Sequence, residues 1–229
     1  AHIPILHTRS EKSDSGKTFR DLVDESGSPA IFTGHVHFRP IYAKPDNTFD
    51  CMAAAFISKQ AYRIIAIDND IYSFSEEIMD VYPAVTITTP TDSTFYHPNT
   101  RVDRLIDQNE IRVLIFDPKS VISTDVKIDG KSIGSLTNAG DNLWVLPYNP
   151  QDYAKGAHEL TVTVKTESGE TVRTHSFNLE DTTATPIKGI YKLVNGTAFE
   201  TVLWTLIAIL TLIAITNVVI GQLWKKFKP

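Results

Sequence analysis

Two histidines separated by a single residue give the sharpest chemical signal in this sequence. They are His35 and His37, in the string GHVH at residues 34–37. The apolar run at residues 30–33 predicts a strand directly before them, and imidazoles on a loop leaving a strand end can both reach a metal site. Gly34 would permit the sharp bend that such a loop needs. Two surface loop histidines explain the string equally well.

A further histidine and a predicted helix precede this string. His2 stands before Ile3-Pro4, at the opening of an apolar run. Residues 18–25 place three apolar side chains at i, i+3 and i+4, which predicts a helix. A third strand is predicted at residues 62–67. This strand, helix and strand order predicts an α/β unit over residues 1–82.

From residue 83 to residue 180 the pattern indicates strands only. The run IRVLIF at 111–116 predicts a central strand, and Asp129-Gly130 predicts a two-residue hairpin turn. Residues 160–165 alternate apolar and polar side chains, as a strand with one buried face does. About seven short strands in ~100 residues predict an all-β, immunoglobulin-like antiparallel sandwich over residues 83–180.

A long uncharged segment near the C-terminus predicts one transmembrane helix. Residues 201–223 contain no charged side chain and are long enough to cross a hydrocarbon layer of ~30 Å. Residues 224–229 form a basic tail, which predicts a cytoplasmic C-terminus. Residues 1–200, including a polar tether at 181–200, would then be lumenal or extracellular, in a single-pass protein that contacts membrane lipid. A buried core helix is the alternative.

The composition restricts the function classes. The formal net charge is −5, which argues against a nucleic-acid partner. The chain has one cysteine, Cys51, so it cannot form an intrachain disulfide, and we expect this thiol to be buried and inert. Because the chain begins without methionine or an export signal, we interpret it as a processed product or a fragment.

Several other polar and aromatic residues have ordinary structural explanations. Four carboxylates that suggest a cation site are interpreted as solvated turn and helix-start residues, since no EF-hand pattern surrounds them: Asp68, Asp70, Glu76 and Glu77. Four aromatic residues are predicted to lie in the sandwich core: Trp144, Tyr148, Tyr153 and Phe177. Three scattered histidines are interpreted as incidental: His97, His158 and His175. Threonines of the C-terminal segment can bond a neighbouring helix or their own backbone.

The order His-x-Pro, helix, short strand and GHVH resembles the closing third of the calcineurin-like metallophosphoesterases, whose core is an α/β sandwich. The string YRIIAIDNDIYSFSEEI at 62–78 and the strand strings that follow resemble a membrane-anchored branch of that superfamily, in which an immunoglobulin-like domain follows the phosphoesterase domain. The resemblance implies that His2 and His35 bind one metal ion and His37 the other. It also implies that His35 and His37 are catalytic residues.

The family's other metal-binding blocks are missing from this sequence. They are an Asp-x-His pair, a GDxxD segment and an Asn-His-Asp/Glu segment, all of which belong upstream of His2. Without the bridging carboxylate, three histidines cannot hold two metal ions (Fe, Mn or Zn) and a reactive water. We therefore expect the C-terminal part of a membrane-bound two-metal phosphoesterase, inactive and without a cofactor unless an upstream phosphoesterase fragment completes it. The alternative is a non-catalytic single-pass subunit or pseudoenzyme that binds other membrane protein subunits.

Overall fold

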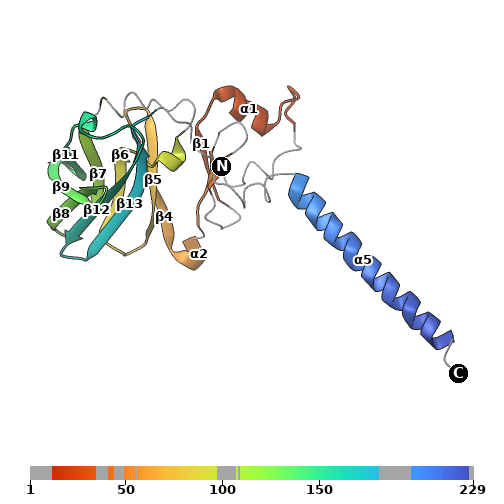
Figure 1. Ribbon diagram of the computed structural model, residues 1–229. Helices are drawn as coiled ribbons and strands as arrows, with labels where there is room; N and C mark the ends of the chain where they lie inside the picture. The colour runs from red at the N-terminus through yellow and green to blue at the C-terminus, as the bar shows by residue number, and fades with distance from the viewer. Residues whose placement is uncertain are drawn as a thin grey trace. The chain divides into compact units, whose positions relative to one another are not determined.

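The computed structural model describes residues 12–34, 41–43, 49–54, 56–96, 107, 109–180 and 197–226. The chain divides into two compact units, residues 1–186 and residues 187–229. The described part of the first unit is almost entirely β, and that of the second is one helix (Figure 1).

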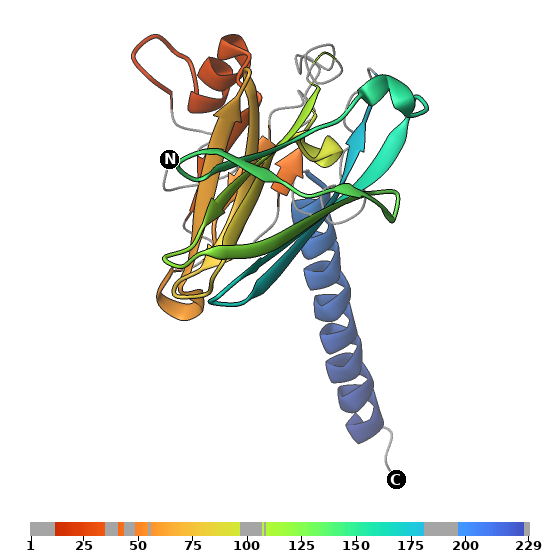
Figure 2. The ribbon, with the colours of Figure 1, turned by 90° about the vertical axis from the view of Figure 1, so that its left-hand side faces the viewer.

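Two four-stranded antiparallel sheets form most of the first unit (Figures 1 and 2). The first sheet has the order β10-β11-β7-β6, with bounds Thr137–Gly140, Leu143–Pro147, Glu110–Phe116 and Ala84–Thr89. The second has the order β13-β12-β8-β9, with bounds Glu170–Asn178, Ala157–Thr166, Val121–Ile128 and Lys131–Gly134. Short 3-10 helices lie at Ser93–Phe95 (η2) and Pro150–Asp152 (η3).

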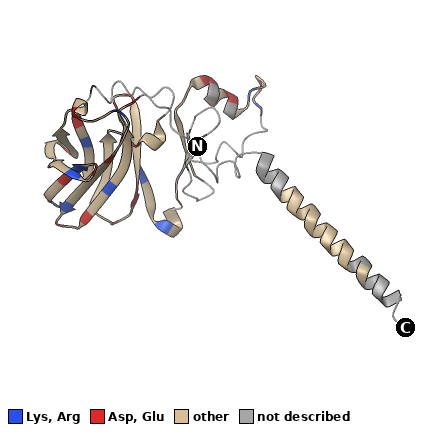
Figure 3. Cartoon of the chain, viewed as in Figure 1, with Lys and Arg blue, Asp and Glu red and all other residues tan. Residues whose placement is uncertain are grey.

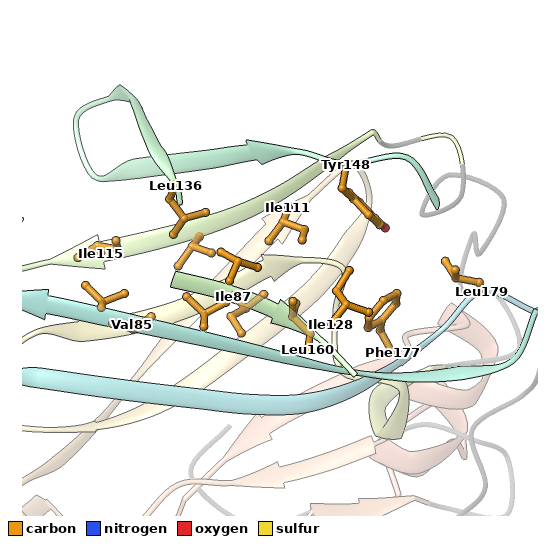
Figure 4. Close-up of a cluster of buried hydrophobic side chains, with 14 residues drawn as sticks. Val85, Ile87, Ile111, Ile115, Ile128, Leu136, Tyr148, Leu160, Phe177 and Leu179 are labelled. Atoms are coloured by element: carbon orange, nitrogen blue, oxygen red, sulfur yellow. The ribbon is translucent and has the colours of Figure 1, made fainter. Parts of the chain in front are cut away.

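One apolar core joins the inner faces of these two sheets. Alternate residues of β7 are buried, and so are Leu160, Val162 and Val164 of β12, because successive side chains on a strand point to opposite faces. Figure 4 shows the cluster, in which residues from both sheets interleave. The predicted aromatic core is confirmed: Tyr148 and Phe177 belong to the cluster, and Trp144 and Tyr153 pack against it.

Two hairpin turns follow from residues that accept a positive φ. Asp129 and Gly130, between β8 and β9, have φ of 51° and 77°. Asn69 and Asp70 have φ of 51° and 64° and connect β4 (Ala61–Asp68) to β5 (Ile71–Ile78). Two consecutive positive φ values match the right-handed twist of antiparallel strands. The predicted Asp129-Gly130 turn is confirmed.

The N-terminal part of this unit contains a short helix and a small mixed sheet. Helix α1 (Phe19–Ser26) confirms the predicted helix, and the Thr18 hydroxyl accepts a hydrogen bond from the Asp21 backbone N–H at 3.1 Å. Strand β1 (Ala30–Thr33) pairs in parallel with β3 (Phe49–Met52), which pairs antiparallel with β2 (Ile41–Ala43). Helix α2 (Phe56–Lys59) then leads into β4.

The predicted α/β unit over residues 1–82 is wrong. The strand that begins at Ala61 does not join a parallel sheet through a helical crossover. It pairs antiparallel with β5 along its whole length, because the turn at Asn69 and Asp70 returns the chain at once. The described fold is therefore mostly β with antiparallel sheets, and β1 with β3 is the one parallel pair among the described strands.

The second unit contains helix α5 (Thr197–Lys226). The prediction that residues 201–223 cross a membrane is not supported: among the described residues, no helix is both long enough and apolar enough for a crossing. Residues 203–217 of this helix carry no charged side chain (Figure 3).

Two threonines of α5 bond their own helix backbone. The Thr211 hydroxyl donates to the Ile207 carbonyl at 2.7 Å, and the Thr216 hydroxyl donates to the Leu212 carbonyl at 2.8 Å. Of the two possibilities that the sequence left open, self-capping is therefore the one realised at these two positions.

Candidate functional site

The three predicted metal ligands, His2, His35 and His37, lie outside the described residues. The structure does describe strand β1 and Gly34, which lead directly to His35. Within the described ranges, no three His, Cys, Asp or Glu side chains gather closely enough to hold a metal ion. The described part therefore contains no metal centre of its own, and the assignment of the three histidines stays a prediction.

Backbone pairing holds strand β1 along its full length. Its four residues pair in register with Phe49–Met52 of β3. Beyond the ladder, the Phe49 N–H donates to the Pro29 carbonyl at 2.9 Å, and the Ala53 N–H donates to the Thr33 carbonyl at 2.8 Å. Backbone hydrogen bonds thus hold β1 at both of its ends, including the end that precedes the GHVH string.

An aromatic cluster attaches this small sheet to the β4–β5 hairpin. The Phe32 ring of β1 lies edge-on to Tyr72 and Phe74 of β5, with ring centroids 6.1 and 5.6 Å apart. The Arg63 guanidinium of β4 lies over the Phe74 ring, 4.5 Å from its centroid, and donates to the Cys51 carbonyl at 2.9 Å. Cys51 is buried, as predicted. Ring contacts and cation–π contacts of this kind prefer defined geometries.

The opposite face of the hairpin lies against β6 of the sandwich through hydroxyl groups. Thr86 and Thr88 of β6 are buried although they are polar. The Ser75 and Thr86 hydroxyls are 2.6 Å apart. The Thr88 hydroxyl donates to Asp68 at 2.9 Å, and the Thr89 hydroxyl donates to the same carboxylate oxygen at 3.2 Å.

Two ion pairs close this interface at its two ends. The Arg112 side chain of β7 donates through Nε to the Asp68 carboxylate at 2.8 Å. At the other end, the Arg173 side chain of β13 donates to the Glu77 carboxylate at 2.6 Å. Glu77 is 4% exposed, so the earlier interpretation of it as a solvated helix-start residue is wrong. Asp68 is likewise a bonded interface residue.

A cavity of about 260 Å³ lies beside this interface, lined by β5, β6, η2 and β13. Its polar lining includes Ser73, Asp92 and His175. Ser73 is 3% exposed, and its hydroxyl has no hydrogen-bond partner. The His175 ring bonds the Pro90 carbonyl through Nε2 at 2.9 Å, so this nitrogen carries the proton. Burial lowers the pKa of His175 although the nearby Asp92 carboxylate acts in the opposite direction. The lowered pKa keeps the ring neutral at pH 7.

His158 has the opposite electrostatic environment. Its ring bonds the Asp129 carboxylate through Nδ1 at 2.7 Å and the Ala154 carbonyl through Nε2 at 2.8 Å. Burial alone would lower the pKa of His158, but these two hydrogen bonds outweigh it and raise the pKa. His158 and His175 each bond a segment distant in the sequence, which is a structural role, and the interpretation that they are incidental to the chemistry stays a prediction.

Sequence reasoning missed the polar interface on β6 and the cavity beside it. A local signal did exist: threonines recur at 86, 88, 89 and 91, where a solvated strand face would be expected to carry charged residues. A strand that alternates apolar residues with threonine has a second face that is suited to hydrogen-bonded burial. No local sequence pattern, however, indicates which element packs against that face.

The antiparallel sandwich defines the structural class of this chain, and solved structures offer only weak likenesses to it. An endo-beta-1,4-mannanase of Cellulomonas fimi (a double mutant) is 21% identical with a TM-score of 0.29, over 42% of this chain and 18% of its own. Fibronectin(III)-like modules of CbhA from Clostridium thermocellum are 18% identical with a TM-score of 0.25, over 30% of this chain and 73% of theirs. Scores this low carry no argument about function.

A curated relative gives a stronger relation. The chain is similar to Transmembrane protein 62 of Mus musculus, with 35% identity over 116 residues. The matched region is 50% of this chain and 18% of the relative, so the chain spans less than a fifth of the relative's length. No protein-family model matches the chain. The relation to Transmembrane protein 62 is thus established over half of the chain, and the relation to calcineurin-like phosphoesterases stays a prediction.

Proposed function

We propose that this chain supplies one segment of a metal-dependent phosphoesterase and that its described part holds a histidine loop in place. The observation that carries this proposal is the position of β1. It ends one residue before the GHVH string and is fixed by pairing with β3 and by the Phe32 contacts. The similarity to Transmembrane protein 62 over half of the chain is consistent with a part of a larger protein.

The positioning role follows from a continuous series of contacts. Phe32 packs on the hairpin, and the hairpin is bonded to the sandwich through Asp68 and Glu77. Each step includes a directional contact, which fixes orientation better than apolar packing alone. A strand end held in this way can present side chains in one defined geometry, as metal binding requires.

In this proposal, His2, His35 and His37 contribute imidazole ligands to two divalent ions (Fe, Mn or Zn). Carboxylates from an upstream phosphoesterase fragment complete the coordination of these ions. Such ions would activate water toward a phosphate ester. The described residues do not provide the missing carboxylates. The chain alone is therefore expected to bind metal weakly and to hydrolyse nothing.

Calorimetric titration of the full chain with Zn²⁺ tests the proposal. The His35→Ala/His37→Ala double variant should bind Zn²⁺ roughly tenfold more weakly or worse. His7→Ala is the matched control, since the family resemblance assigns His7 no ligand position, and this variant should bind Zn²⁺ as the wild type does. Equal Zn²⁺ affinity in the double variant and the control, or no Zn²⁺ binding by the wild type, would refute the proposal.

A second candidate is a non-catalytic subunit of a membrane protein complex. Its support is the exposed apolar face of β4, where Ile65 and Ile67 are 45% and 79% exposed. The name of the mouse relative describes a membrane protein, and we propose association with membrane proteins or lipid for this chain as well.

This second function is tested by affinity purification from native membranes with quantitative mass spectrometry. The Ile65→Asp/Ile67→Asp variant should lose a stoichiometric partner that the wild type and Ile122→Asp retain. Ile122 is a suitable control because it is 60% exposed and lies on β8. Identical partners in all three samples would exclude this face as the binding surface.

A further inference from the structure

One histidine joins three segments at one end of the sandwich. His158 is the second residue of β12, and its side chain is 10% exposed. Its ring centroid lies 5.6 Å from that of Phe177 on β13 and 5.6 Å from that of Tyr153, which follows η3. Tyr148 and Phe177 lie at the same end of the buried cluster (Figure 4). The histidine is thus placed where the chain between β11 and β12 meets the core.

Both nitrogens of the His158 ring lie on hydrogen-bond acceptors. Nδ1 is 2.7 Å from the Asp129 carboxylate, and Nε2 is 2.8 Å from the Ala154 carbonyl. A backbone carbonyl can only accept. The N–H of Glu159 and the His158 ring both bond Asp129 and lower its pKa, so this carboxylate is ionised and also accepts. A neutral imidazole has a single N–H, and only the protonated ring makes both bonds at once.

Loss of one proton from the ring breaks the bond to Ala154 and keeps the bond to Asp129. A hydrogen bond to an ionised carboxylate is stronger than one to a neutral carbonyl, so the remaining proton stays on Nδ1. The lone pair of Nε2 then faces the lone pairs of the Ala154 carbonyl at 2.8 Å. Two acceptors at this distance repel each other, and the carbonyl has to move away.

The η3 segment, residues 149–155, depends on this bond. Its other described hydrogen bonds run from one residue of the segment to another. Among the hydrogen bonds that the structure describes for these residues, the one from His158 to Ala154 is the one that leads to a sheet. The buried Pro150 holds the start of the segment, and the Gly156 carbonyl accepts the Leu179 N–H at 3.0 Å just after its end. Residues 151–155 are therefore the part that the histidine secures.

One charged group faces the histidine ring. The Asp129 carboxylate reaches it from the β8–β9 turn. From β13 it meets the uncharged Phe177 ring, and from the η3 segment it meets the Tyr153 phenol, whose pKa is raised mainly by burial. Three charged side chains nearby are exposed and make no contact with the ring that the structure describes: Asp152, Lys155 and Glu159. Protonation of the ring is thus governed by Asp129 and by the Ala154 carbonyl.

We propose that His158 is a pH-sensitive latch that holds the η3 segment on the sandwich when the ring is protonated and releases residues 151–155 when the ring is neutral. Release moves the Tyr153 ring away from the Tyr148 ring, whose centroid is 6.2 Å from it, and uncovers this end of the core. The latch is closed in acidic solution and open in alkaline solution. It is separate from the metal-binding histidines and requires no metal.

Methyl NMR of the full chain with isotope-labelled alanine tests this proposal. The His158 ring resonances give the midpoint of its titration, which should lie above the ordinary value of 6.5. As the pH rises through this midpoint, the order parameter of the Ala154 methyl axis should fall from roughly 0.85, typical of a rigid backbone, to below about 0.6. Ala157, within β12, should stay rigid throughout. An Ala154 order parameter that stays constant, or that falls on acidification, would overturn the proposal.

Asp129→Asn distinguishes a latch from a histidine that only supports the fold. Asparagine keeps an oxygen for the Glu159 N–H and tolerates the φ of 51° at this position, but it lacks the charge that stabilises the protonated ring. The midpoint of the Ala154 transition should therefore fall by roughly one pH unit. Asp141→Asn, at an exposed turn with a φ of 47°, is the matched control and should leave the midpoint unchanged. Equal midpoints in the two folded variants would contradict the latch.

His158→Gln provides an independent measurement, because glutamine does not titrate. The Ala154 order parameter should become independent of pH in this variant. His175→Gln removes a histidine of β13 and should preserve the pH response. Thermal unfolding establishes that each variant is folded, and the ring titration of the wild type decides the question if His158→Gln is not. A pH response that persists in folded His158→Gln would assign the transition to another group.

Discussion

Strand β6 is buried on both faces, but its two faces are covered by different chemistry. Val85 and Ile87 enter the apolar core of the sandwich, whereas Thr86 and Thr88 face the hydroxyls and carboxylates of the β4–β5 hairpin. Apolar burial is strong and non-directional, while hydrogen bonds to charged groups depend on geometry. This difference indicates that the sandwich core provides stability, whereas the hairpin interface fixes the position of the hairpin on the sandwich.

The largest expected effect comes from the core. Phe177→Ala removes a fully buried ring and should lower the free energy of unfolding by about 3–5 kcal/mol in urea denaturation. Val172→Ala, on the same strand but 50% exposed, should change it by less than about 0.5 kcal/mol. A similar small loss in both variants would mean that the core is not the main source of stability.

The next effect concerns the charged end of the hairpin interface. Asp68→Asn weakens the bonds from Arg112, Thr88 and Thr89 and should cost about 1.5–3 kcal/mol. Asp80→Asn removes the same charge from an exposed turn residue just after β5 and serves as the control. Hydrogen exchange should increase first in β4 and β5 and much less in β12. If hydrogen exchange accelerates equally in the β4–β5 hairpin and in β12, the hairpin interface has no separate role in positioning the hairpin.

A smaller effect is expected at the neutral hydroxyl pair. Ser75→Ala leaves the buried Thr86 hydroxyl without its partner and should cost about 1 kcal/mol. The double variant Ser75→Ala/Thr86→Val replaces both polar groups and should recover most of that loss. A double-mutant cycle measures the coupling, and strictly additive losses would show that this pair contributes no specific interaction.

The pH dependence of stability should differ in sign between two histidines. His158 has a raised pKa, so its stabilising contribution is complete below its ordinary value of 6.5 and is lost as pH rises through the folded-state value. His175 has a lowered pKa, so stability falls as pH drops from 6.5 toward the folded-state value. His158→Gln and His175→Gln should therefore change the slope of unfolding free energy against pH in opposite directions. Changes of the same sign would contradict these environments.

Features governed by neighbouring residues were predictable from the sequence. The Asp129-Gly130 turn, the alternation in β7 and β12, and helix α1 each depend on residues within a few positions of one another. The aromatic core was also predicted, because large aromatic side chains are usually part of a core. These parts of the fold were predicted because turn chemistry and periodicity are local properties.

Features governed by distant partners were not predictable. Glu77 is buried because Arg173 reaches it, and these residues are 96 positions apart. The α/β prediction failed because the order of elements matched an α/β unit, whereas the turn at Asn69 and Asp70 directs β4 into a hairpin. The cavity near Ser73 arises where β5, β6 and β13 meet, and no single segment indicates it. The histidines of the GHVH string remain a prediction from sequence.

Side chains of strand β13 reach the outer edge of strand β6. Its alternate residues extend to carbonyl groups on and beside β6: Thr171 bonds Pro83 at 2.7 Å, Arg173 bonds Val85 at 3.2 Å, and His175 bonds Pro90. An outer strand normally leaves such carbonyls open to strand addition by another chain, which begins aggregation. Side chains of β13 occupy these acceptors here, so we expect this edge of β6 to be less open to strand addition by another chain.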